Sequence, residues 1–460
     1  MDISDRNNIK LRDRQVAIIG LGRSGVAAAR LADHLGAQVF VSDSHDSPTV
    51  AENYRRLQHD SIAGEIGGHG DRIYQADLWV LSPGIARNAP LVLEAQNRGI
   101  SIVSEIEFAS WFTMAPLLAV TGSNGKTTTV HALAKMCQTE HSHSALSGNM
   151  GVPFSQIVLA DLIEPDPRRI HVLEISSFQM EFIHHFRPKV SVFLNISPDH
   201  LDRYSSMDEY VAAKMRMAVN AGTEDFIVYN ADDDYLNQAF TEAAAHTRSF
   251  SLKDIPGALF TVNRTKIKNF EHATLIPLDE VALPGQHNLA NLLAAATAAH
   301  LAGAPDQSIA MAMGTFRGVP HRLEKVAEFN GVTYVNDSKA TNLDAVKVAL
   351  KSYPGPIILI LGGKDKGGDF SELLPLFRNR VKQIIAIGQA QPRILAALRD
   401  AARPIPLDGL RDAVKFTRDS AEPGDIVLLS PGCASFDQFR DFEDRGDQFK
   451  QLVQEEVVNA

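Results

Sequence analysis

The sequence predicts an α/β protein of three domains, each built on a mostly parallel sheet. Short apolar runs rich in β-branched residues alternate with amphipathic segments of helical length along most of the chain. Each run ends in a glycine or a polar turn, as buried parallel strands commonly do. The pattern restarts near residue 105 and again near residue 319, and 460 residues are too many for one hydrophobic core.

The expected strands divide among the three domains in chain order. Residues 1–104 contain QVAIIG, QVFVSD and LWVLSPG; residues 105–318 contain PLLAVTG, IHVLEIS, VSVFLNIS and DFIVYNADD; residues 319–460 contain VTYVNDS, PIILILGG, QIIAIG and DIVLLSPG. We therefore expect a Rossmann-like N-terminal domain, a central domain like a P-loop ATPase and a Rossmann-like C-terminal domain. Ligands of such sheets bind at the carboxyl ends of the strands, where these turns lie.

Composition and charge exclude several classes of partner. The formal net charge is -10 and no basic stripe is present, which argues against a nucleic-acid partner. The two cysteines, Cys137 and Cys433, are too few for a disulfide framework and indicate a reducing compartment. The first residues lack the apolar core of a signal peptide, and no apolar run approaches a bilayer span. We expect a cytoplasmic, soluble monomer without membrane insertion.

The stretch QVAIIGLGRSGVAAAR raises the first functional hypothesis. Gly20, Gly22 and Gly25 form a G-x-G-x-x-G pattern between an apolar strand and a helix, and Asp43 closes the next strand. This is the dinucleotide-binding fingerprint with its acidic ribose partner, so an NAD-dependent oxidoreductase is one alternative. The loop itself predicts only a strand-to-helix turn that favours a diphosphate.

A second glycine loop, TGSNGKTTT, also joins an apolar strand to a helix. Its backbone N–H groups favour an anion, Lys126 adds a positive charge for terminal phosphates, and the Thr127 hydroxyl is a suitable ligand for phosphate-bound Mg²⁺. The spacing G-x-x-G-K-T is shorter than that of the general P-loop. The alternative is a tight turn that contains glycine and lysine without binding phosphate. The combination of strand, glycines, lysine and threonines favours the phosphate interpretation.

The shortened loop resembles that of the Mur ligase family, ATP-dependent enzymes that form amide bonds in peptidoglycan precursor synthesis. Other stretches resemble the family in order along essentially the whole chain: SGNMG, LEISSFQME, NISPDHLDRY, GQHNLANLLAA, HRLE, NDSKATN and LLSPGCASFDQFRDFEDRG. The last two, with SPGIARNAP, are most like the members that add D-glutamate. The resemblance implies ligation of D-glutamate to UDP-N-acetylmuramoyl-L-alanine through an acyl phosphate and a tetrahedral intermediate, with release of ADP and phosphate.

The resemblance implies a set of catalytic and metal-binding residues in the central domain. Lys126, Glu174, His200 and Lys214 are the expected catalytic residues, and Thr127, Glu174, His200 and Lys214 the expected ligands of two Mg²⁺ ions. Lys214 would be carbamylated, because an ordinary ammonium would repel the metals. Taken alone, Glu174 could form a surface ion pair, His200 could be structural and Lys214 could be an unremarkable helix lysine.

The same resemblance implies residues for the three substrates. ATP would contact Gly122, Ser123, Asn124, Gly125, Lys126, Thr127, Thr128, Asn288, Asn291, Arg322 and Asp337. The UDP-linked substrate would contact Gly22, Arg23, Ser24, Asp43, Ser44, Ser82, Gly84, Asn149 and His200. D-Glutamate would contact Lys339, Thr341, Lys366, Ser435 and Phe442, with Lys364 as a neighbouring candidate for Lys366. Its two carboxylates call for such cations and hydroxyls.

Three alternatives stay open beside this hypothesis. An oxidoreductase would leave TGSNGKTTT and DSKATN unexplained, and a non-enzymatic nucleotide sensor would be expected to lack Lys126, Glu174, His200 or Lys214. A Mur-type ligase for another amino acid is the nearest alternative. The members that add diaminopimelate or lysine carry a DNPR-like motif that this sequence lacks.

Overall fold

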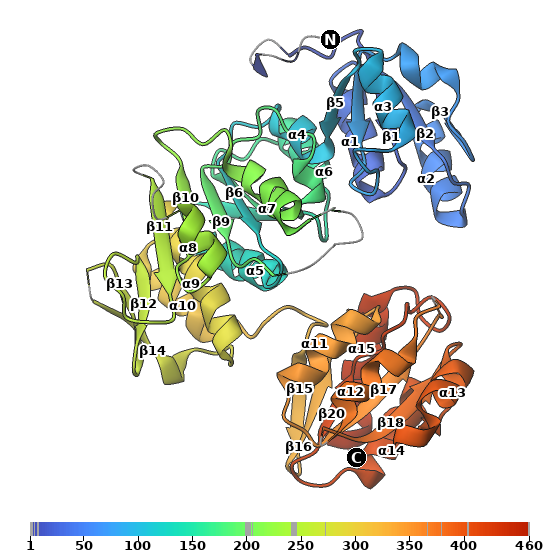
Figure 1. Ribbon diagram of the computed structural model, residues 1–460, viewed down its shortest axis with the longest axis vertical. Helices are drawn as coiled ribbons and strands as arrows, with labels where there is room; N and C mark the ends of the chain where they lie inside the picture. The colour runs from blue at the N-terminus through green and yellow to red at the C-terminus, as the bar shows by residue number, and fades with distance from the viewer. Residues whose placement is uncertain are drawn as a thin grey trace. The chain divides into compact units, whose positions relative to one another are not determined.

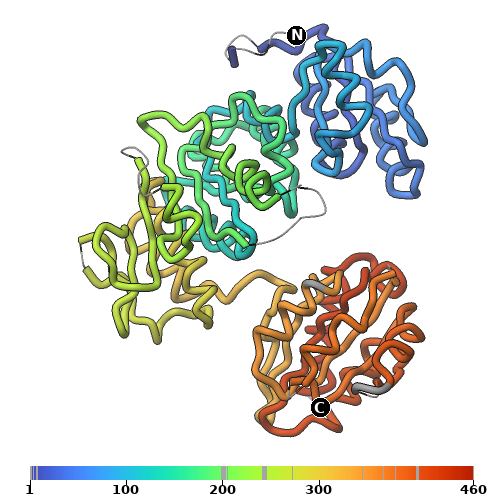
Figure 2. Tube along the Cα trace, in the orientation of Figure 1, coloured from blue at the N-terminus to red at the C-terminus, as the bar shows by residue number. Residues whose placement is uncertain are grey.

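The computed structural model describes residues 3, 5, 6, 9–197, 204, 206–240, 246–271, 273–365, 367–378, 380–402 and 404–458 (Figure 2). The chain divides into two compact units, Met1–Phe316 and Arg317–Ala460, the second coloured orange to red in Figure 1. Each unit has its own hydrophobic core. No helix within the described ranges is both long and apolar enough to cross a membrane.

The first sheet of unit Met1–Phe316 is wholly parallel, in the order β3-β2-β1-β4-β5. Its strands are β1 (Gln15–Ile19), β2 (Gln38–Asp43), β3 (Ala63–Ile66), β4 (Leu78–Leu81) and β5 (Ser101–Ser104). Its helices are α1 (Arg23–His34), α2 (Pro48–His59), α3 (Pro90–Asn97) and α4 (Glu105–Ser110).

Alternation along β1 explains how this sheet is covered on both faces. Val16 and Ile18 belong to an apolar cluster with alanines of α1, whereas Ala17 and Ile19 belong to a second cluster with residues of α3. Successive side chains of a strand point to opposite faces, so a continuous apolar run has a partner on each side. The result is the Rossmann-like layer expected from QVAIIG.

Among the described residues, the second sheet has nine strands in the order β14-β13-β12-β11-β10-β9-β6-β8-β7. They are β6 (Leu117–Thr121), β7 (His143–Gly148), β8 (Arg169–Glu174), β9 (Val190–Phe193), β10 (Phe226–Asn230), β11 (Thr247–Ser251), β12 (Phe260–Asn263), β13 (Lys266–Asn269) and β14 (Thr274–Pro277). Its helices are α5 (Lys126–Cys137), α6 (Phe154–Ile163), α7 (Met207–Met215), α8 (Asp234–Phe240), α9 (Gln286–Leu301) and α10 (Asp306–Thr315). The strands are parallel except for the antiparallel pairs β12–β13 and β13–β14.

Two buried glutamates join the first sheet to the second inside this unit. Glu107 of α4 accepts hydrogen bonds from the backbone N–H groups of His185 and Phe186, at 2.7 and 2.8 Å. Glu105 accepts one from Ser155 N–H of α6 at 2.6 Å, and burial raises the pKa of Glu105. These buried hydrogen bonds fix α4, which follows the last strand of the first sheet, against segments that belong to the second sheet.

Unit Arg317–Ala460 has six strands in the order β15-β16-β20-β17-β18-β19, and only the described pair β15–β16 is antiparallel. The strands are β15 (Glu324–Phe329), β16 (Val332–Asn336), β17 (Ile357–Gly362), β18 (Val381–Ile387), β19 (Ile405–Pro406) and β20 (Ile426–Leu429). The helices are α11 (Leu343–Ser352), α12 (Leu374–Phe377), α13 (Gln391–Ala402), α14 (Leu410–Ser420) and α15 (Phe442–Val453).

The same alternation builds this second core. Ile357, Leu359 and Leu361 of β17 pack in a cluster with residues of α11 and α13, whereas Ile358 and Ile360 pack with residues of α14 and α15. Figure 1 shows these helices around the sheet. The three-domain α/β fold with mostly parallel sheets is therefore confirmed. The exact boundaries 104/105 and 318/319 stay predictions.

Candidate functional site

The second glycine loop lies between the carboxyl end of β6 and the first turn of α5. Gly125 is the N-cap of α5 with φ +87°, and a Cβ there would lie 2.2 Å from Asn291 Oδ1 of α9. Glycine is therefore required both by the backbone conformation and by the close approach of α9. No side chain of the described part of the chain caps α5, which leaves its first-turn N–H groups able to bind an anion.

Two ammonium groups converge on the carbonyl oxygen of Gly122. Lys126 Nζ donates to Gly122 O at 2.7 Å and to Ser123 O at 3.0 Å, so its side chain folds back over the loop. Lys214 Nζ, buried on α7, donates to Gly122 O at 3.1 Å and lies 4.6 Å from the Tyr210 ring centroid. This loop therefore combines open N–H groups with the side chains of two lysines, and an unmodified lysine adds a positive charge that suits a polyphosphate.

Other polar contacts fix the shape of the loop. Ser123 Oγ and the Tyr210 hydroxyl lie 3.0 Å apart, which joins α7 to the loop. Asn124 N–H donates to Asn195 Oδ1 at 2.8 Å, and Asn195 Nδ2 donates back to Asn124 O at 3.1 Å. Thr127 and Thr128 are buried in the first turn of α5. Neither Tyr210 nor Asn195 was predicted from the sequence, because neither belongs to a phosphate-loop pattern.

Glu174 ends β8, the strand that pairs with β6, and its two carboxylate oxygens differ in their surroundings. Oε1 accepts a hydrogen bond from Asn149 Nδ2 at 3.0 Å. Oε2 is buried and has no hydrogen-bond partner within the described part of the chain. A buried unpartnered carboxylate oxygen is costly unless a cation or water satisfies it, so Glu174 fits the role of a Mg²⁺ ligand.

The remaining predicted residues of the central domain are His200, Asn288 and Asn291. His200 lies outside the described residues. Asn291 is buried against Gly125, whereas Asn288 Nδ2 donates to Pro284 O at 2.7 Å, back toward the start of α9. Within the described ranges, no three His, Cys, Asp or Glu side chains form a group that could hold a metal.

The first glycine loop is organised by a carboxylate. Asp43 Oδ2 accepts a hydrogen bond from Leu21 N–H at 2.7 Å, and its Oδ1 accepts one from His45 N–H at 2.9 Å. A Cβ at Gly25 would lie 1.9 Å from Gly20 O, which explains the third glycine of the pattern as a close helix–strand contact. Gly22 is the N-cap of α1, and Arg23 and Ser24 begin that helix.

Two neighbouring loops join this carboxyl edge. Ser82, after β4, donates from its Oγ to Gly20 O at 2.9 Å, while Gly84 is exposed. The segment after β3 is tied to the segment after β2, because Gly67 N–H donates to His45 O and Gly68 N–H to Asp43 O, at 3.2 and 3.3 Å. The exposed residue Ser44 lies in that second segment.

A polar cluster at this edge escaped the sequence analysis. Ser42 Oγ donates to Glu65 Oε1 at 2.9 Å and lies 2.7 Å from His69 Nδ1. The tautomer of His69 that is protonated at Nδ1 can therefore donate a hydrogen bond to the Ser42 oxygen. Burial lowers the pKa of His69, against the charges of Asp43 and Glu65. The only available signal was a histidine in the glycine-rich turn GGHG.

In unit Arg317–Ala460, Asp337 follows β16 and is buried. Ser430 Oγ donates to Asp337 Oδ2 at 2.7 Å and Leu323 N–H to its Oδ1 at 3.2 Å. Burial raises the pKa of Asp337 to about 7, although these hydrogen bonds and the charge of Arg322 act in the opposite direction. Lys339 N–H donates to His321 O at 3.0 Å, which joins this segment to the HRLE segment.

The predicted D-glutamate residues lie in segments at the carboxyl edge of this sheet. Lys339 and Thr341 follow β16, and Ser435 follows β20 and is buried. Phe442 begins α15, with its ring centroid 6.2 Å from that of His321. Lys366 lies outside the described residues, and its exposed neighbour Lys364 donates from its backbone N–H to Ala434 O at 2.8 Å.

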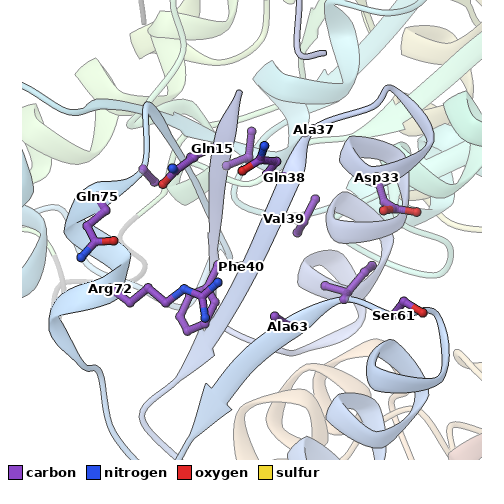
Figure 3. Close-up of a pocket in the computed structure, with 13 residues that line it drawn as sticks. Gln15, Asp33, Ala37, Gln38, Val39, Phe40, Ser61, Ala63, Arg72 and Gln75 are labelled. Carbon is purple, nitrogen blue, oxygen red and sulfur yellow. The ribbon is translucent and has the colours of Figure 1, made fainter. Parts of the chain in front are cut away.

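A cavity of about 320 Å³ in the first domain lies at the other end of the sheet. Gln15, Gln38 and Ala63, which begin β1, β2 and β3, contribute to its lining (Figure 3). The Arg72 guanidinium lies 4.4 Å from the Phe40 ring centroid in the same cavity (Figure 3). Because it opens at the amino ends of the strands, this cavity is separate from the glycine loop and Asp43.

Three family models match the chain and together cover most of it. Residues 14–104 match the Mur ligase MurD-like N-terminal domain, residues 120–299 the Mur ligase middle domain, and residues 321–433 the Mur ligase glutamate ligase domain. The matches follow the three sheets in order.

Relatives with a common name are similar along nearly the whole chain. A UDP-N-acetylmuramoylalanine–D-glutamate ligase of Acidobacterium capsulatum is 43% identical over 452 residues, covering 97% of each chain. The protein of the same name from Salinibacter ruber is 40% identical over 459 residues, covering 97% of this chain and 98% of the relative.

Solved structures support the fold. MurF from Acinetobacter baumannii superposes with a TM-score of 0.58 at 16% identity, covering 94% of this chain and 93% of that one. The UDP-N-acetylmuramate-alanine ligase MurC of Thermotoga maritima gives 0.57 at 18% identity, covering 96% and 99%. MurF ligase of Thermotoga maritima, solved in complex with ADP, gives 0.55 at 16% identity, covering 99% and 97%.

Proposed function

The chain belongs to the Mur ligase family, and from that membership we propose that it is an ATP-dependent ligase that joins D-glutamate to UDP-N-acetylmuramoyl-L-alanine. The observation that carries the proposal is its similarity, over nearly the whole chain, to relatives named for this reaction. The phosphate loop at the carboxyl end of β6, onto which Lys126 and Lys214 converge, supports the use of ATP. The reaction would release ADP and phosphate and belong to peptidoglycan precursor synthesis.

The reaction requires activation of a carboxylate in water. ATP would transfer its γ-phosphoryl group to the alanyl carboxylate, which gives an acyl phosphate and ADP. The D-glutamate amine would attack the acyl carbon, and the tetrahedral intermediate would expel phosphate as the amide forms. Phosphoryl transfer depends mainly on positioning and on charge neutralisation. Lys126 and the N–H groups of α5 would hold the phosphates.

The donor set at the second loop fits Mg²⁺. We propose that Glu174 and Thr127 hold one ion, and that His200 and carbamylated Lys214 hold a second. The unpartnered Glu174 Oε2 supports this assignment, since hard cations favour carboxylate oxygens. The ions would supply neutralisation of phosphate charge. The ATP contacts would come from residues 122–128, Asn288, Asn291, Arg322 and Asp337.

The other two substrates would use the edges of the first and third sheets. The UDP-linked substrate would contact Gly22, Arg23, Ser24, Asp43, Ser44, Ser82, Gly84, Asn149 and His200. D-Glutamate would contact Lys339, Thr341, Lys366, Ser435 and Phe442. An α1 N-terminus without a side-chain cap supports diphosphate binding at the first loop.

The test is phosphate release from ATP in the presence of UDP-N-acetylmuramoyl-L-alanine and a panel of amino acids. We expect release to depend strictly on D-glutamate. Equal rates with L-glutamate or meso-diaminopimelate would overturn the assignment of D-glutamate. A change in nicotinamide absorbance without phosphate release would instead favour an oxidoreductase. We further propose a cytoplasmic monomer, and sedimentation of the purified chain tests the monomer.

A further inference from the structure

We propose that Arg445 is the positioning residue that holds the D-glutamate-binding segments of unit Arg317–Ala460 in one arrangement. This inference rests on the proposed function, because it concerns the binding of the amino-acid substrate. Arg445 lies on α15, three residues after Phe442, and sequence analysis gave it no role. Within the stretch FEDRG, the sequence alone suggests that this arginine is one of several charged residues on an exposed helix surface.

The guanidinium of Arg445 is fully buried and donates to two different segments. Its Nε donates to Ser338 Oγ at 2.9 Å and its Nη2 to Ser338 O at 2.8 Å. Its Nη1 donates to Cys433 O at 3.2 Å. Ser338 Oγ in turn donates to Phe442 O at 2.8 Å, which closes the network onto the start of α15.

These contacts join the segments that carry the predicted substrate residues. Ser338 precedes Lys339 and Thr341 after β16, and Cys433 lies two residues before Ser435 after β20. The segment after β17 is adjacent as well, because a Cβ at Gly363 would lie 3.1 Å from Arg445 Nη1 and 2.4 Å from Ala434 O. The planar fork of one arginine therefore contacts or borders all three strand ends.

The positive charge of Arg445 is satisfied by neutral hydrogen-bond acceptors. No carboxylate of the described residues forms a salt bridge with it, and its three hydrogen-bond acceptors are two carbonyls and a hydroxyl. Burial lowers the pKa of Arg445 to about 10, so the guanidinium stays protonated at neutral pH. The charges of Asp437 and Asp337 act against this lowering, but neither carboxylate accepts one of the hydrogen bonds of the guanidinium. The buried cation therefore adds a positive charge beside the predicted site, which favours a dicarboxylate substrate.

The test compares Arg445→Lys with the wild type in the full chain. Lysine keeps the charge but lacks the fork that reaches Ser338 and Cys433 together. We expect the KM for D-glutamate to rise about 30-fold, while the KM values for ATP and the UDP-linked substrate stay within about twofold. Added guanidinium should partly restore Arg445→Ala. Arg418→Lys, an exposed arginine of α14 paired with Asp419, is the matched control.

Ser338→Ala is a milder second variant, since it removes only one hydroxyl, which accepts from Arg445 Nε and donates to Phe442 O. We expect a rise of about fivefold in the KM for D-glutamate with little change in melting temperature. An unchanged KM in this variant and in folded Arg445→Lys would overturn the inference, as would an equal rise for all three substrates together with a lower melting temperature. If the wild type itself shows no D-glutamate-dependent phosphate release, the proposed function fails instead.

Discussion

The two glycine loops of unit Met1–Phe316 have the same backbone plan and different charges around it. Each follows a buried strand and ends in a glycine N-cap, Gly22 for α1 and Gly125 for α5, without a side-chain cap. The first loop is held by a carboxylate, through Asp43 and Leu21 N–H, whereas two lysines converge on the second at Gly122 O. In the proposed reaction both turns would bind a phosphate, and the surrounding charges would decide whether that phosphate is only bound or also transferred.

Lys126→Ala removes the positive charge that distinguishes the second loop most directly. We expect turnover to fall about 10³-fold, because the lysine neutralises charge during phosphoryl transfer. Phosphate release at saturating substrates measures the effect. Lys135→Ala, an exposed lysine near the end of the same helix, is the control and should keep full turnover. Arg23→Ala in the first loop should change turnover far less, and equal losses would erase the contrast between the loops.

Lys214→Arg separates the charge of this lysine from its carbamylation. Arginine has the positive charge of an unmodified lysine and can donate to Gly122 O, but it does not form the carbamate. We expect turnover of the variant, measured by phosphate release, to fall about 10²-fold. The wild type should lose activity when CO₂ is removed and should regain it when bicarbonate is added. Lys135→Arg is the matched control. Turnover above half of the wild-type value would rule out the carbamate.

Asp43→Asn tests whether the first loop is only a binding element. The amide keeps one acceptor oxygen, so one of the two hydrogen bonds from Leu21 N–H and His45 N–H is lost. We expect the KM for the UDP-linked substrate to rise about 10-fold with little change in kcat. Asp46→Asn, exposed in the same segment, should behave as the wild type. A fall in kcat with unchanged KM would place Asp43 in the chemistry.

His69→Gln has the smallest expected effect and tests the pH dependence of the first loop region. Burial lowers the pKa of His69 in the folded chain, so the fold favours the neutral ring. Its contribution to stability is present above the unfolded pKa of about 6.5 and is lost as the pH falls below it. Between about pH 6.5 and 5 we expect the wild-type melting temperature to fall 1–2 °C more than that of His69→Gln. Parallel curves would contradict this.

Much of the fold could be predicted because its strands are buried on both faces. Runs such as PIILILGG are apolar throughout, and β17 has an apolar cluster on each side. The antiparallel strands β12, β13 and β14 were not predicted, since they are short and mix charged residues with apolar ones, as in KIKN. Family resemblance identified the candidate site residues, and the structure places most of them at strand ends.

The residues that sequence analysis missed act through three-dimensional contacts. Tyr210 reaches Ser123 from a helix 87 positions away in the sequence, and Arg445 reaches Ser338 across 107 positions. No local pattern marks either residue. His69 is a similar case, because only the pairing of β2 with β3 brings its turn to Ser42.

The antiparallel strands β12, β13 and β14 at one edge of the nine-stranded sheet affect how the chain behaves at high concentration. A long parallel sheet that ended in a regular strand would offer its unpaired backbone groups to a neighbouring molecule. Here β14 ends the sheet, is only four residues long and finishes at Pro277, which has no N–H to donate. This border therefore protects the β14 edge of the nine-stranded sheet against edge-to-edge aggregation.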